Sequence, residues 1–245
     1  MPTSTKIGYS FVWQKEDGTV VTSTTQNTTI GDHTLTGSLI AKTYSVTSGA
    51  NIEGVTVTVN STGTFDSDLS ISTSGSATGY DYTFTDIKVY SGTSTSGTLL
   101  ATYTSTSATF TMTGTYYDDI YVYATWSRTA IATTIYVTNS LFGNVVTYKS
   151  GSGAGVTIKA AGGGGKWTYS VVDAWCNNVA AQSAFECYSL SPTGETTDSA
   201  YLRCFGDIKS FPILAVAEYH YFIVATSVYN GTTASIEITF QCTRS

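Results

Sequence analysis

The acidic residues that could form a catalytic pair occur in two clusters, Asp66/Asp68 and Asp118/Asp119. A pair of carboxylates can help to bind calcium, which takes about six to eight oxygen ligands. Such a pair can also serve glycoside hydrolysis as acid and nucleophile. Neither cluster matches an EF-hand or an RTX repeat. We therefore interpret both as solvated turn residues and expect no metal site, so a polysaccharide-degrading glycosidase is the least favoured function.

The two histidines, His33 and His220, lack the sequence context of nucleophilic catalysis. A nucleophile elbow has the pattern G-x-S-x-G, which does not occur in the chain. His220 lies between aromatic residues in EYHYF, and we expect it to be partly buried and hydrogen-bonded. We predict no catalytic residue, and therefore no enzyme.

The glycine-rich segment 160–167 (AAGGGGKW) is the closest approach to a phosphate-binding loop. A Walker loop needs a glycine at the first position and a Ser or Thr after the lysine to bind magnesium. Here Ala160 and Trp167 stand at those two places. We interpret the segment as a loop between two strands and expect no cofactor.

The four cysteines all lie in the C-terminal half, at positions 176, 187, 204 and 242, without the C-x-x-C spacing of a structural zinc site. Cys187 shares its alternation with Phe185, and Cys204 shares its alternation with Leu202. The turn-rich sequence SPTGETTDS separates these segments, which predicts a hairpin with both thiols on its core side. Two interpretations stay open for Cys187 and Cys204: buried thiols, or a disulfide formed after release into an oxidising environment.

Aromatic residues are the most suggestive feature, because the chain contains 18 tyrosines and four tryptophans. Tyrosine provides a large, rigid contact with a polar tip, which suits protein interfaces and sugar platforms. It also covers sheet faces in thin sandwiches. We predict an interface from the aromatic residues of the N-terminal hairpin and of one crowded region, namely Tyr9, Phe11, Trp13, Tyr116, Tyr117, Tyr121 and Tyr123. Sugar stacking is the alternative for Trp126, Trp167 and Trp175.

Composition excludes several classes of partner. Charged residues make up 11% of the chain, well below the usual share of about a quarter, whereas 41% of residues are hydrophobic, so the chain can fold. The net charge is −6 and the 11 basic residues are scattered, so we expect neither nucleic acid nor an anionic membrane surface as a partner. The N-terminus has no secretory signal pattern, which predicts synthesis in the cytosol.

Period-two alternation recurs along the chain and predicts an all-β protein. Residues 7–24 read as a hairpin around Asp17-Gly18, and 25–34 as a loop or arm. A turn or bulge at Thr85-Asp86 would reconcile the two halves of segment 79–92. The apolar stretch 211–225 is too short to span a bilayer and reads as two buried strands joined at Glu218. Further strands are expected at 54–60, 67–73, 98–104, 108–114, 119–126, 133–139, 144–150, 154–160, 166–172, 184–190, 200–206 and 234–244.

These strands predict two tandem antiparallel β-sandwich domains, Ig-like or jelly-roll, with an N-terminal hairpin or arm. The boundaries are expected at 1–34 for the hairpin and arm, 35–128 for the first sandwich and 129–245 for the second. One large domain is the alternative. A faint similarity between GTYYDDIYVYATWSR and GTTASIEITFQCTR is compatible with duplication.

The segment FTDIKVYSGTSTSGTLLATYT (84–104) resembles the middle of a CUB-type jelly-roll domain, on Asp86, Val89, Tyr90, Gly92 and Leu99-Leu100. The usual disulfide framework is absent, so the resemblance supports only a sandwich. At whole-chain level, the Thr/Ser/Gly-rich strands, low charge and leaderless Met1 resemble tailed-bacteriophage virion accessory proteins: capsid decoration proteins, head fibres and tail-associated Ig-like modules.

That resemblance implies a non-enzymatic structural protein of the virion, assembled in the host cytoplasm. It would bind other virion proteins of the capsid or tail and be present as a homo-oligomer or in many copies. A carbohydrate-binding or adhesin module, with a glycan as ligand, is the alternative.

Overall fold

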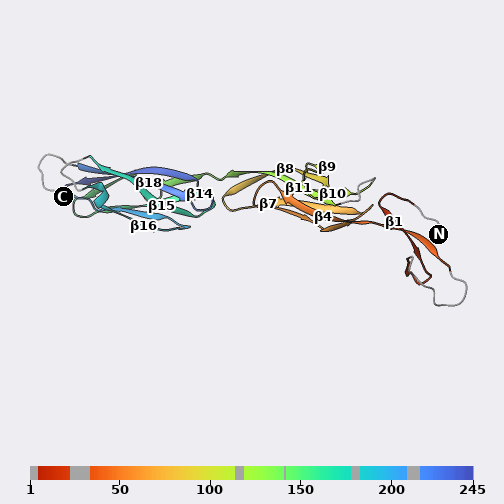
Figure 1. Cartoon of the computed structure of the whole chain (residues 1–245). Helices are drawn as coiled ribbons and strands as arrows, with labels where there is room; N and C mark the ends of the chain where they lie inside the picture. Colours follow the sequence, from red (N-terminus) through yellow and green to blue (C-terminus); the bar gives the residue numbers. More distant parts are fainter. Residues whose placement is uncertain are drawn as a thin grey trace. The chain divides into compact units, whose positions relative to one another are not determined.

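The computed structural model describes residues 5–22, 34–113, 119–140, 142–177, 183–208 and 216–244, and these residues form an all-β protein (Figure 1). One 3-10 turn, Ala184–Glu186, interrupts the strands. None of the described segments is a helix with the length and hydropathy of a membrane span. The predicted fold class is confirmed: two β-sandwiches follow a small N-terminal sheet.

The N-terminal sheet has the strand order β2-β1-β3. Strands β1 (Tyr9–Gln14) and β2 (Val20–Val21) form the predicted hairpin, in which Gly18 has a φ of 81° and the Asp17 carboxylate accepts a hydrogen bond from the Thr19 N–H at 2.9 Å. Strand β3 (Thr36–Ala41) pairs antiparallel with β1 along its whole length. Strand β3 is not among the strands predicted from the sequence, and most of the predicted loop 25–34 lies outside the described residues.

The first sandwich packs a three-stranded sheet, β10-β7-β5, against a five-stranded sheet, β6-β4-β11-β8-β9. Its core combines Leu69, Ile71 and Phe110 of the first sheet with Ile87, Val89, Ile120 and Val122 of the second. The strands are β4 (Thr43–Ala50), β5 (Val55–Val59), β6 (Thr62–Thr64), β7 (Asp68–Gly75), β8 (Tyr80–Ser91), β9 (Leu99–Tyr103), β10 (Ser107–Thr111) and β11 (Ile120–Ala130).

Strand β8 changes the face that it buries at the predicted place. Phe84 packs against the core, and so does Ile87, three residues later. An uninterrupted strand would place these two side chains on opposite faces. The phase change at Thr85-Asp86 lets one strand of 12 residues bury aromatic side chains in its first half and Ile87 and Val89 in its second.

The second sandwich has the strand arrangement of an immunoglobulin domain. One sheet has the order β12-β14-β17-β16, and the other has the order β13-β19-β18-β15. Tyr219, Tyr221, Ile223, Ile238 and Phe240 form the centre of its core, with no exposed surface. The strands are β12 (Thr133–Val137), β13 (Val145–Lys149), β14 (Ala154–Gly162), β15 (Trp167–Cys176), β16 (Tyr188–Ser191), β17 (Ala200–Cys204), β18 (Val216–Ser227) and β19 (Thr233–Thr243).

The expected division of residues 211–225 at Glu218 is wrong. Glu218 lies inside β18, which is continuous from Val216 to Ser227, and residues 211–215 lie outside the described ones. The glutamate does not break the strand, because it occupies the outer face while Ala217 and Tyr219 on either side are buried. Its carboxylate accepts hydrogen bonds from the Gln241 and Asn177 side chains at 2.9 and 3.0 Å.

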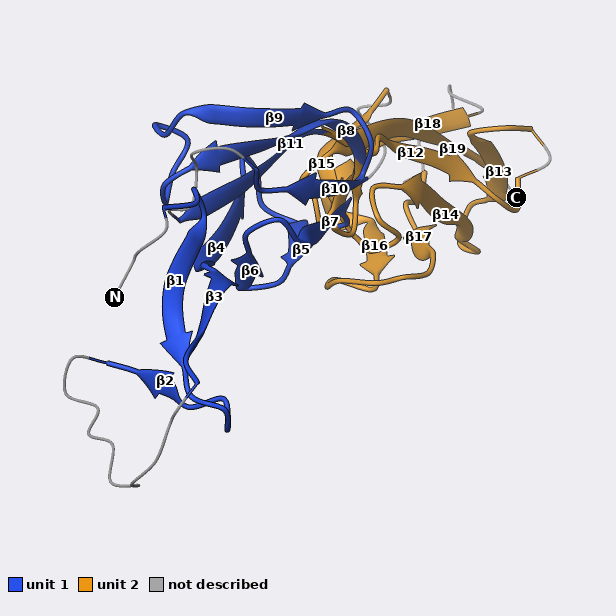
Figure 2. Cartoon of the chain, turned by 90° about the vertical axis from the view of Figure 1, so that its right-hand side faces the viewer, with its two compact units in different colours: residues 1–76, 82–127 blue, residues 77–81, 128–245 orange. Residues whose placement is uncertain are grey.

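The chain divides into two compact units (Figure 2). Unit 1 comprises residues 1–76 and 82–127, and unit 2 comprises residues 77–81 and 128–245. The division at 127/128 lies one residue from the boundary expected at 128/129. The N-terminal sheet belongs to unit 1, whereas the connection between β7 and β8 is grouped with unit 2.

Candidate functional site: the apolar N-terminal sheet

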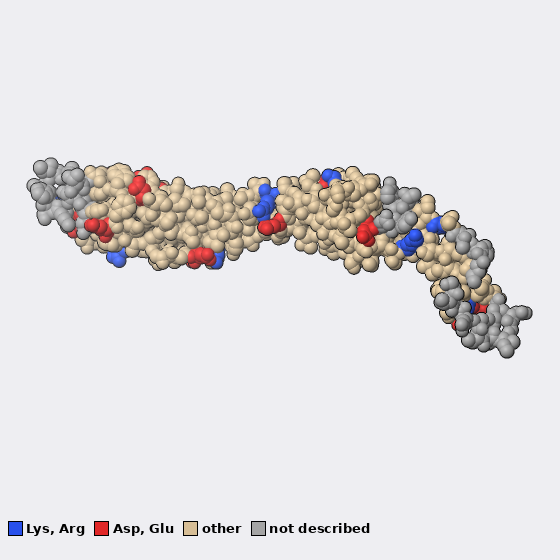
Figure 3. Space-filling view, viewed as in Figure 1, with Lys and Arg blue, Asp and Glu red and all other residues tan. Residues whose placement is uncertain are grey.

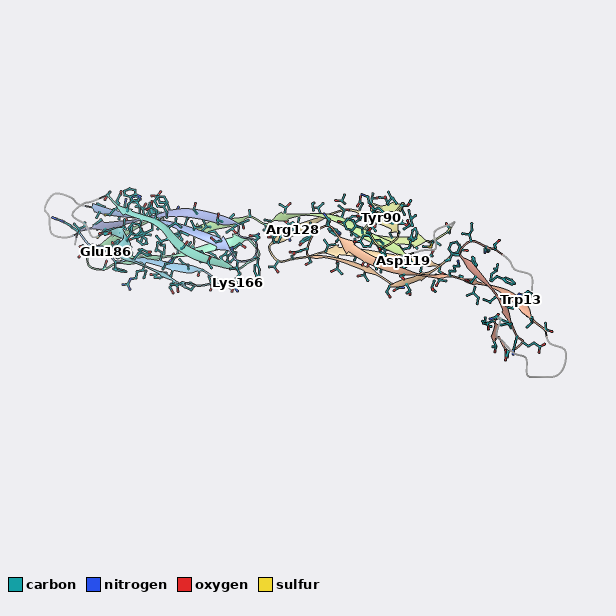
Figure 4. All side chains as sticks on the ribbon, in the orientation of Figure 1. Trp13, Tyr90, Asp119, Arg128, Lys166 and Glu186 are labelled. Carbon is teal, nitrogen blue, oxygen red and sulfur yellow. The ribbon has the colours of Figure 1, made fainter. Side chains whose placement is uncertain are left out.

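One face of the N-terminal sheet carries Tyr9, Phe11, Trp13 and Leu39, which we call the aromatic face. Phe11 lies directly opposite Leu39, and Trp13 lies opposite Gly37. The Phe11 and Trp13 rings meet edge to face, with centroids 5.3 Å apart and planes at 90°. A Cβ on Gly37 would lie 2.7 Å from the Phe11 ring, so the glycine allows this ring to lie across β3. Figure 4 labels Trp13 on this sheet.

The opposite face of the same sheet is mixed, with polar residues beside two exposed apolar side chains. Ile40 is 45% exposed and Val20 is 42% exposed, while Leu39 on the aromatic face is 41% exposed. No residue of β1, β2 or β3 is buried. Figure 2 shows β1 and β3 extending beyond the two sheets of the first sandwich. The sheet therefore exposes large hydrophobic side chains on both faces, where a sandwich would cover one of them.

The first sandwich holds the base of this sheet through Tyr9. The Tyr9 ring packs edge to face on Phe65, with centroids 5.6 Å apart, and its hydroxyl donates a hydrogen bond to the Asp66 carboxylate at 2.6 Å. That hydrogen bond is the main reason why the pKa of Tyr9 lies above its ordinary value. The Lys42 N–H donates to the Gly8 carbonyl at 2.8 Å. Among the described residues, the Tyr9 contacts attach the sheet to the sandwich at the end where β1 begins.

The carboxylates considered for glycoside hydrolysis have structural partners instead. Asp66 accepts the Tyr9 hydrogen bond, and Asp68 accepts a hydrogen bond from the Thr111 hydroxyl across β7 and β10. Of the second cluster, Asp118 lies outside the described residues. Across the described ranges, no group of three His, Cys, Asp or Glu side chains could hold a metal ion.

Tyr121 and Tyr123 lie elsewhere, on the outer face of β11. Their ring centroids are 6.0 Å apart with planes inclined by 32°. Tyr121 reaches over Gly49 of the neighbouring strand β4, where a Cβ would lie 2.2 Å from its hydroxyl. The structure therefore separates these two candidates from Tyr9, Phe11 and Trp13. The remaining two, Tyr116 and Tyr117, lie outside the described residues.

Aromatic rings that cover strand glycines recur in both units. The hydroxyl of Tyr44 lies over Gly63, and that of Tyr201 lies over Gly155; added Cβ atoms would come within 2.3 and 2.1 Å of them. A glycine in a strand leaves a gap that a cross-strand ring can fill. This arrangement explains part of the Tyr- and Gly-rich composition without any ligand.

The three tryptophans considered for sugar binding differ in exposure. Trp126 is 8% exposed and donates its indole N–H to the Thr73 hydroxyl at 3.1 Å, and Trp167 is 5% exposed. Both are core residues and cannot present a ring face to a glycan. Trp175 is 44% exposed and stacks flat on His220, with centroids 3.7 Å apart and planes at 5°.

His220 is partly buried and hydrogen-bonded, as predicted. Its side chain is 12% exposed, its Nδ1 lies 2.7 Å from a Glu237 carboxylate oxygen, and its Nε2 lies 3.7 Å from a Glu218 oxygen. These three side chains come from the adjacent strands β18 and β19. Together with Trp175 they form a polar cluster on the outer face of that sheet. The other histidine, His33, lies outside the described residues.

Cys187 and Cys204 are buried, and they form no disulfide in this structure. Cys187 donates to the Ser183 carbonyl at 2.8 Å, and the Cys204 sulfur lies 3.4 Å from the Tyr148 hydroxyl. The expected hairpin is present as β16 and β17, with Tyr188 rather than Cys187 opposite Cys204. Burial, followed by the Cys204 contact, raises the pKa of Tyr148.

The glycine-rich segment is the connection between β14 and β15, as predicted. Gly162, Gly163, Gly164 and Gly165 all have positive φ angles, from 55° to 91°. The Ser227 hydroxyl donates to the Gly163 carbonyl inside unit 2. The glycines therefore meet a backbone requirement of the turn.

Comparison with known proteins gives no family. No family model matches the chain, and no curated protein matches it. Among solved structures, domains 4 and 5 of the S-layer protein SbsC align over 96% of this chain and 98% of their own length, with 11% identity and a TM-score of 0.30.

Two other solved structures align at a similar level. The fibronectin(III)-like modules of Clostridium thermocellum CbhA cover 77% of this chain and 95% of their own, with 10% identity and a TM-score of 0.26. The major pilin subunit BcpA of Bacillus cereus covers 97% of this chain and 65% of its own, with 10% identity and a TM-score of 0.24. The fold assignment rests on the strand order given above.

Proposed function

We propose that this protein is a non-enzymatic structural component of a tailed-phage virion, assembled in the host cytoplasm. In this proposal the N-terminal sheet docks on an apolar surface of a capsid or tail protein. The observation that carries the proposal is the sheet itself, which exposes apolar side chains on two faces and has no buried residue.

Physical chemistry favours a partner for such a sheet. Small strand assemblies need a covered hydrophobic face to be stable in water, and contiguous exposed apolar surface commonly marks an interaction site. Apolar burial contributes about 25 cal/mol per Å². Covering Phe11, Trp13 and Leu39 would supply that contribution, with the two aromatic rings as anchors.

The charge distribution supports an apolar rather than an ionic contact. Figure 3 shows isolated charged residues on a mostly neutral surface. The N-terminal sheet itself carries no charged residue in β1, β2 or β3. We therefore expect binding to persist when sodium chloride is raised to molar levels, because salt screens charges but leaves apolar burial intact.

Mass spectrometry and electron microscopy of purified source particles test the virion role. We expect wild-type protein and a Trp175→Ser variant to associate with particles, while a Phe11→Ser/Trp13→Ser variant does not. Deletion of residues 1–26, which removes β1 and β2, should likewise abolish incorporation. Trp175→Ser is the matched control because it removes an exposed aromatic ring from unit 2. Absence of the wild-type chain from every particle, or normal incorporation of the double variant, would contradict the proposal.

A carbohydrate-binding or adhesin module is the second candidate, and Trp175 is the observation that favours it. This ring is exposed and stacked on His220, and the imidazole in turn contacts the carboxylates of Glu218 and Glu237. Such a platform suits stacking against a sugar together with hydrogen bonds. A glycan array with wild-type protein and Trp175→Ala tests it. Binding that is lost in the variant while the fold persists would favour this candidate over the first.

A further inference from the structure

The outer edge of β3 is a hydrogen-bonding edge with no described strand beyond it. The strand order β2-β1-β3 places β3 at the margin of its sheet. The Lys42 N–H points toward β1, because it donates to the Gly8 carbonyl. Backbone groups alternate in direction along a strand. Those of Ile40 and Ser38 therefore also point toward β1, and those of Gly37, Leu39 and Ala41 point away from it.

Strand β3 itself lacks three of the features that normally prevent strands from pairing between molecules, namely charged side chains, proline and a bulge. Natural edge strands are protected by charged side chains, proline, bulges or a covering loop. Residues 34–41 read TLTGSLIA, without a charge or a proline. The β1–β3 register is continuous over six residue pairs, without a bulge.

We infer that β3 pairs antiparallel with β3 of a second copy of this chain, around a two-fold axis at Leu39. The inference deepens the assembly role proposed for this sheet, on which it rests, and names a second copy as the occupant of the edge. A two-fold contact uses the same patch on both copies, so the edge must be complementary to itself.

The edge meets that requirement. With the axis at Leu39, the two Leu39 residues face each other and Gly37 of each copy faces Ala41 of the other. All three residues direct their N–H and C=O groups outward, so each can exchange hydrogen bonds with its counterpart. Leu39 shares its face with Phe11. The pairing therefore joins the aromatic faces of two copies into one larger apolar surface.

Cysteine crosslinking in the purified full-length protein tests the register. Directly opposed residues of a hydrogen-bonded pair have Cα atoms about 5.5 Å apart, within the range of about 4.4–6.8 Å that a disulfide spans. Leu39→Cys should therefore give a disulfide-linked dimer on a non-reducing gel under mild oxidation. Ile40→Cys is the matched control. In the proposed register the two Ile40 positions are diagonal neighbours about 7–8 Å apart, which is too far for a disulfide. Wild type, run in parallel, accounts for the four native thiols.

Light scattering after size exclusion gives an independent readout. We expect wild type at twice the chain mass of 26.0 kDa. Leu39→Lys should be a monomer with an unchanged circular dichroism spectrum. A wild-type monomer at all concentrations, or equal crosslinking of Leu39→Cys and Ile40→Cys, overturns the inference. The virion role is measured separately on particles, so a dimer that never associates with particles would refute that role and leave the pairing intact.

Discussion

The two sandwiches differ in the strand that pairs with β11 in unit 1 and with the corresponding strand β18 in unit 2. In unit 2, strand β18 lies between β15 and β19, and β19 pairs with it antiparallel as the last strand of the chain. In unit 1, the corresponding strand β11 lies between β8 and β4, and β4 pairs with it in parallel. We call β19 and β4 the closing strands of their sheets. In unit 2 the closing strand β19 follows its partner β18 in the chain, whereas in unit 1 the closing strand β4 precedes all other strands of its sandwich.

The short connection between the units explains this difference. Strand β11 ends at Ala130 and β12 begins at Thr133, so no residues are available for a strand that returns to unit 1. Strand β4 occupies that position and brings Tyr44 and Val46 into the core. Because only Lys42 separates β3 from β4, the proposed docking sheet and the closing strand are consecutive. We therefore expect the folding of unit 1, but not that of unit 2, to depend on the N-terminal segment.

Removal of β4 should have the largest effect. A chain that begins at Asn51 loses five ladder pairs with β11 and the buried Tyr44 and Val46. Each large buried side chain contributes about 1.5–3 kcal/mol, against a total of about 5–15 kcal/mol for a domain. Hydrogen exchange should show loss of protection throughout unit 1 and full protection in unit 2.

A chain that begins at Lys42 is the control for that truncation. It lacks the N-terminal sheet but retains β4, so unit 1 should keep its protection. If the chain that begins at Lys42 also unfolds in unit 1, the base of the N-terminal sheet is itself required, which contradicts the assignment of this role to β4 alone. If neither truncation unfolds unit 1, the closing role of β4 is wrong.

Alkaline pH should have the next largest effect, because we expect it to destabilise unit 2 more than unit 1. Burial raises the pKa of Tyr148, Tyr219 and Tyr221 in unit 2, and of Tyr44 and Tyr103 in unit 1. A raised native pKa means that the neutral phenol is favoured in the folded state. The associated stability is complete below the unfolded value of about 10 and is lost as pH rises above it.

Urea unfolding at several pH values, followed by hydrogen exchange, measures this effect. We expect little change from pH 7 to 9 and a loss of stability above pH 10 that is steeper in unit 2, where the shifts are larger. If the free energy of unfolding falls with pH equally steeply in the two units, burial of the unit 2 phenols does not favour their neutral form as strongly as expected.

We expect a smaller loss of stability from Tyr219→Phe, which removes a hydrogen bond between β18 and the segment that precedes it. The Tyr219 hydroxyl donates to the Asp207 carbonyl at 3.0 Å, upstream of β18, and the ring lies over Gly206. Loss of one such hydrogen bond costs about 0.5–1.5 kcal/mol. Thermal unfolding of Tyr219→Phe beside Tyr9→Phe, which removes the hydroxyl of a half-buried tyrosine of unit 1, measures this loss. A smaller loss of stability in Tyr219→Phe than in Tyr9→Phe would show that the Tyr219–Asp207 hydrogen bond does not stabilise unit 2 as expected.

Reducing agent should have the smallest effect, namely none. None of the four cysteines forms a disulfide in this structure, and three of them are buried in unit 2. Removal of a native disulfide typically costs about 2–5 kcal/mol, which thermal unfolding with and without reductant would detect. A fall of several degrees in the melting temperature would show that the protein forms a disulfide in solution, with Cys187 and Cys204 as the first pair to examine.

Local patterns in the sequence determined most of the strands. Period-two alternation, the Asp17-Gly18 turn and the phase change at Thr85-Asp86 all depend on neighbours within a few residues, and the structure has all three. The hairpin of β16 and β17 follows from the same kind of signal. The all-β class was therefore accessible from the sequence alone.

Only the tertiary structure decided what β3 and β4 do. Their alternation is irregular because Leu39 and Ile40 lie on opposite faces of an uncovered sheet, whereas Tyr44 and Val46 share one buried face. Similarly, nothing local shows that Glu218 faces outward within a continuous strand, or that Gly49 lies beneath Tyr121. Alternation specifies that a segment can be a strand. Its partner, its register and the side that is covered depend on residues far away in the chain.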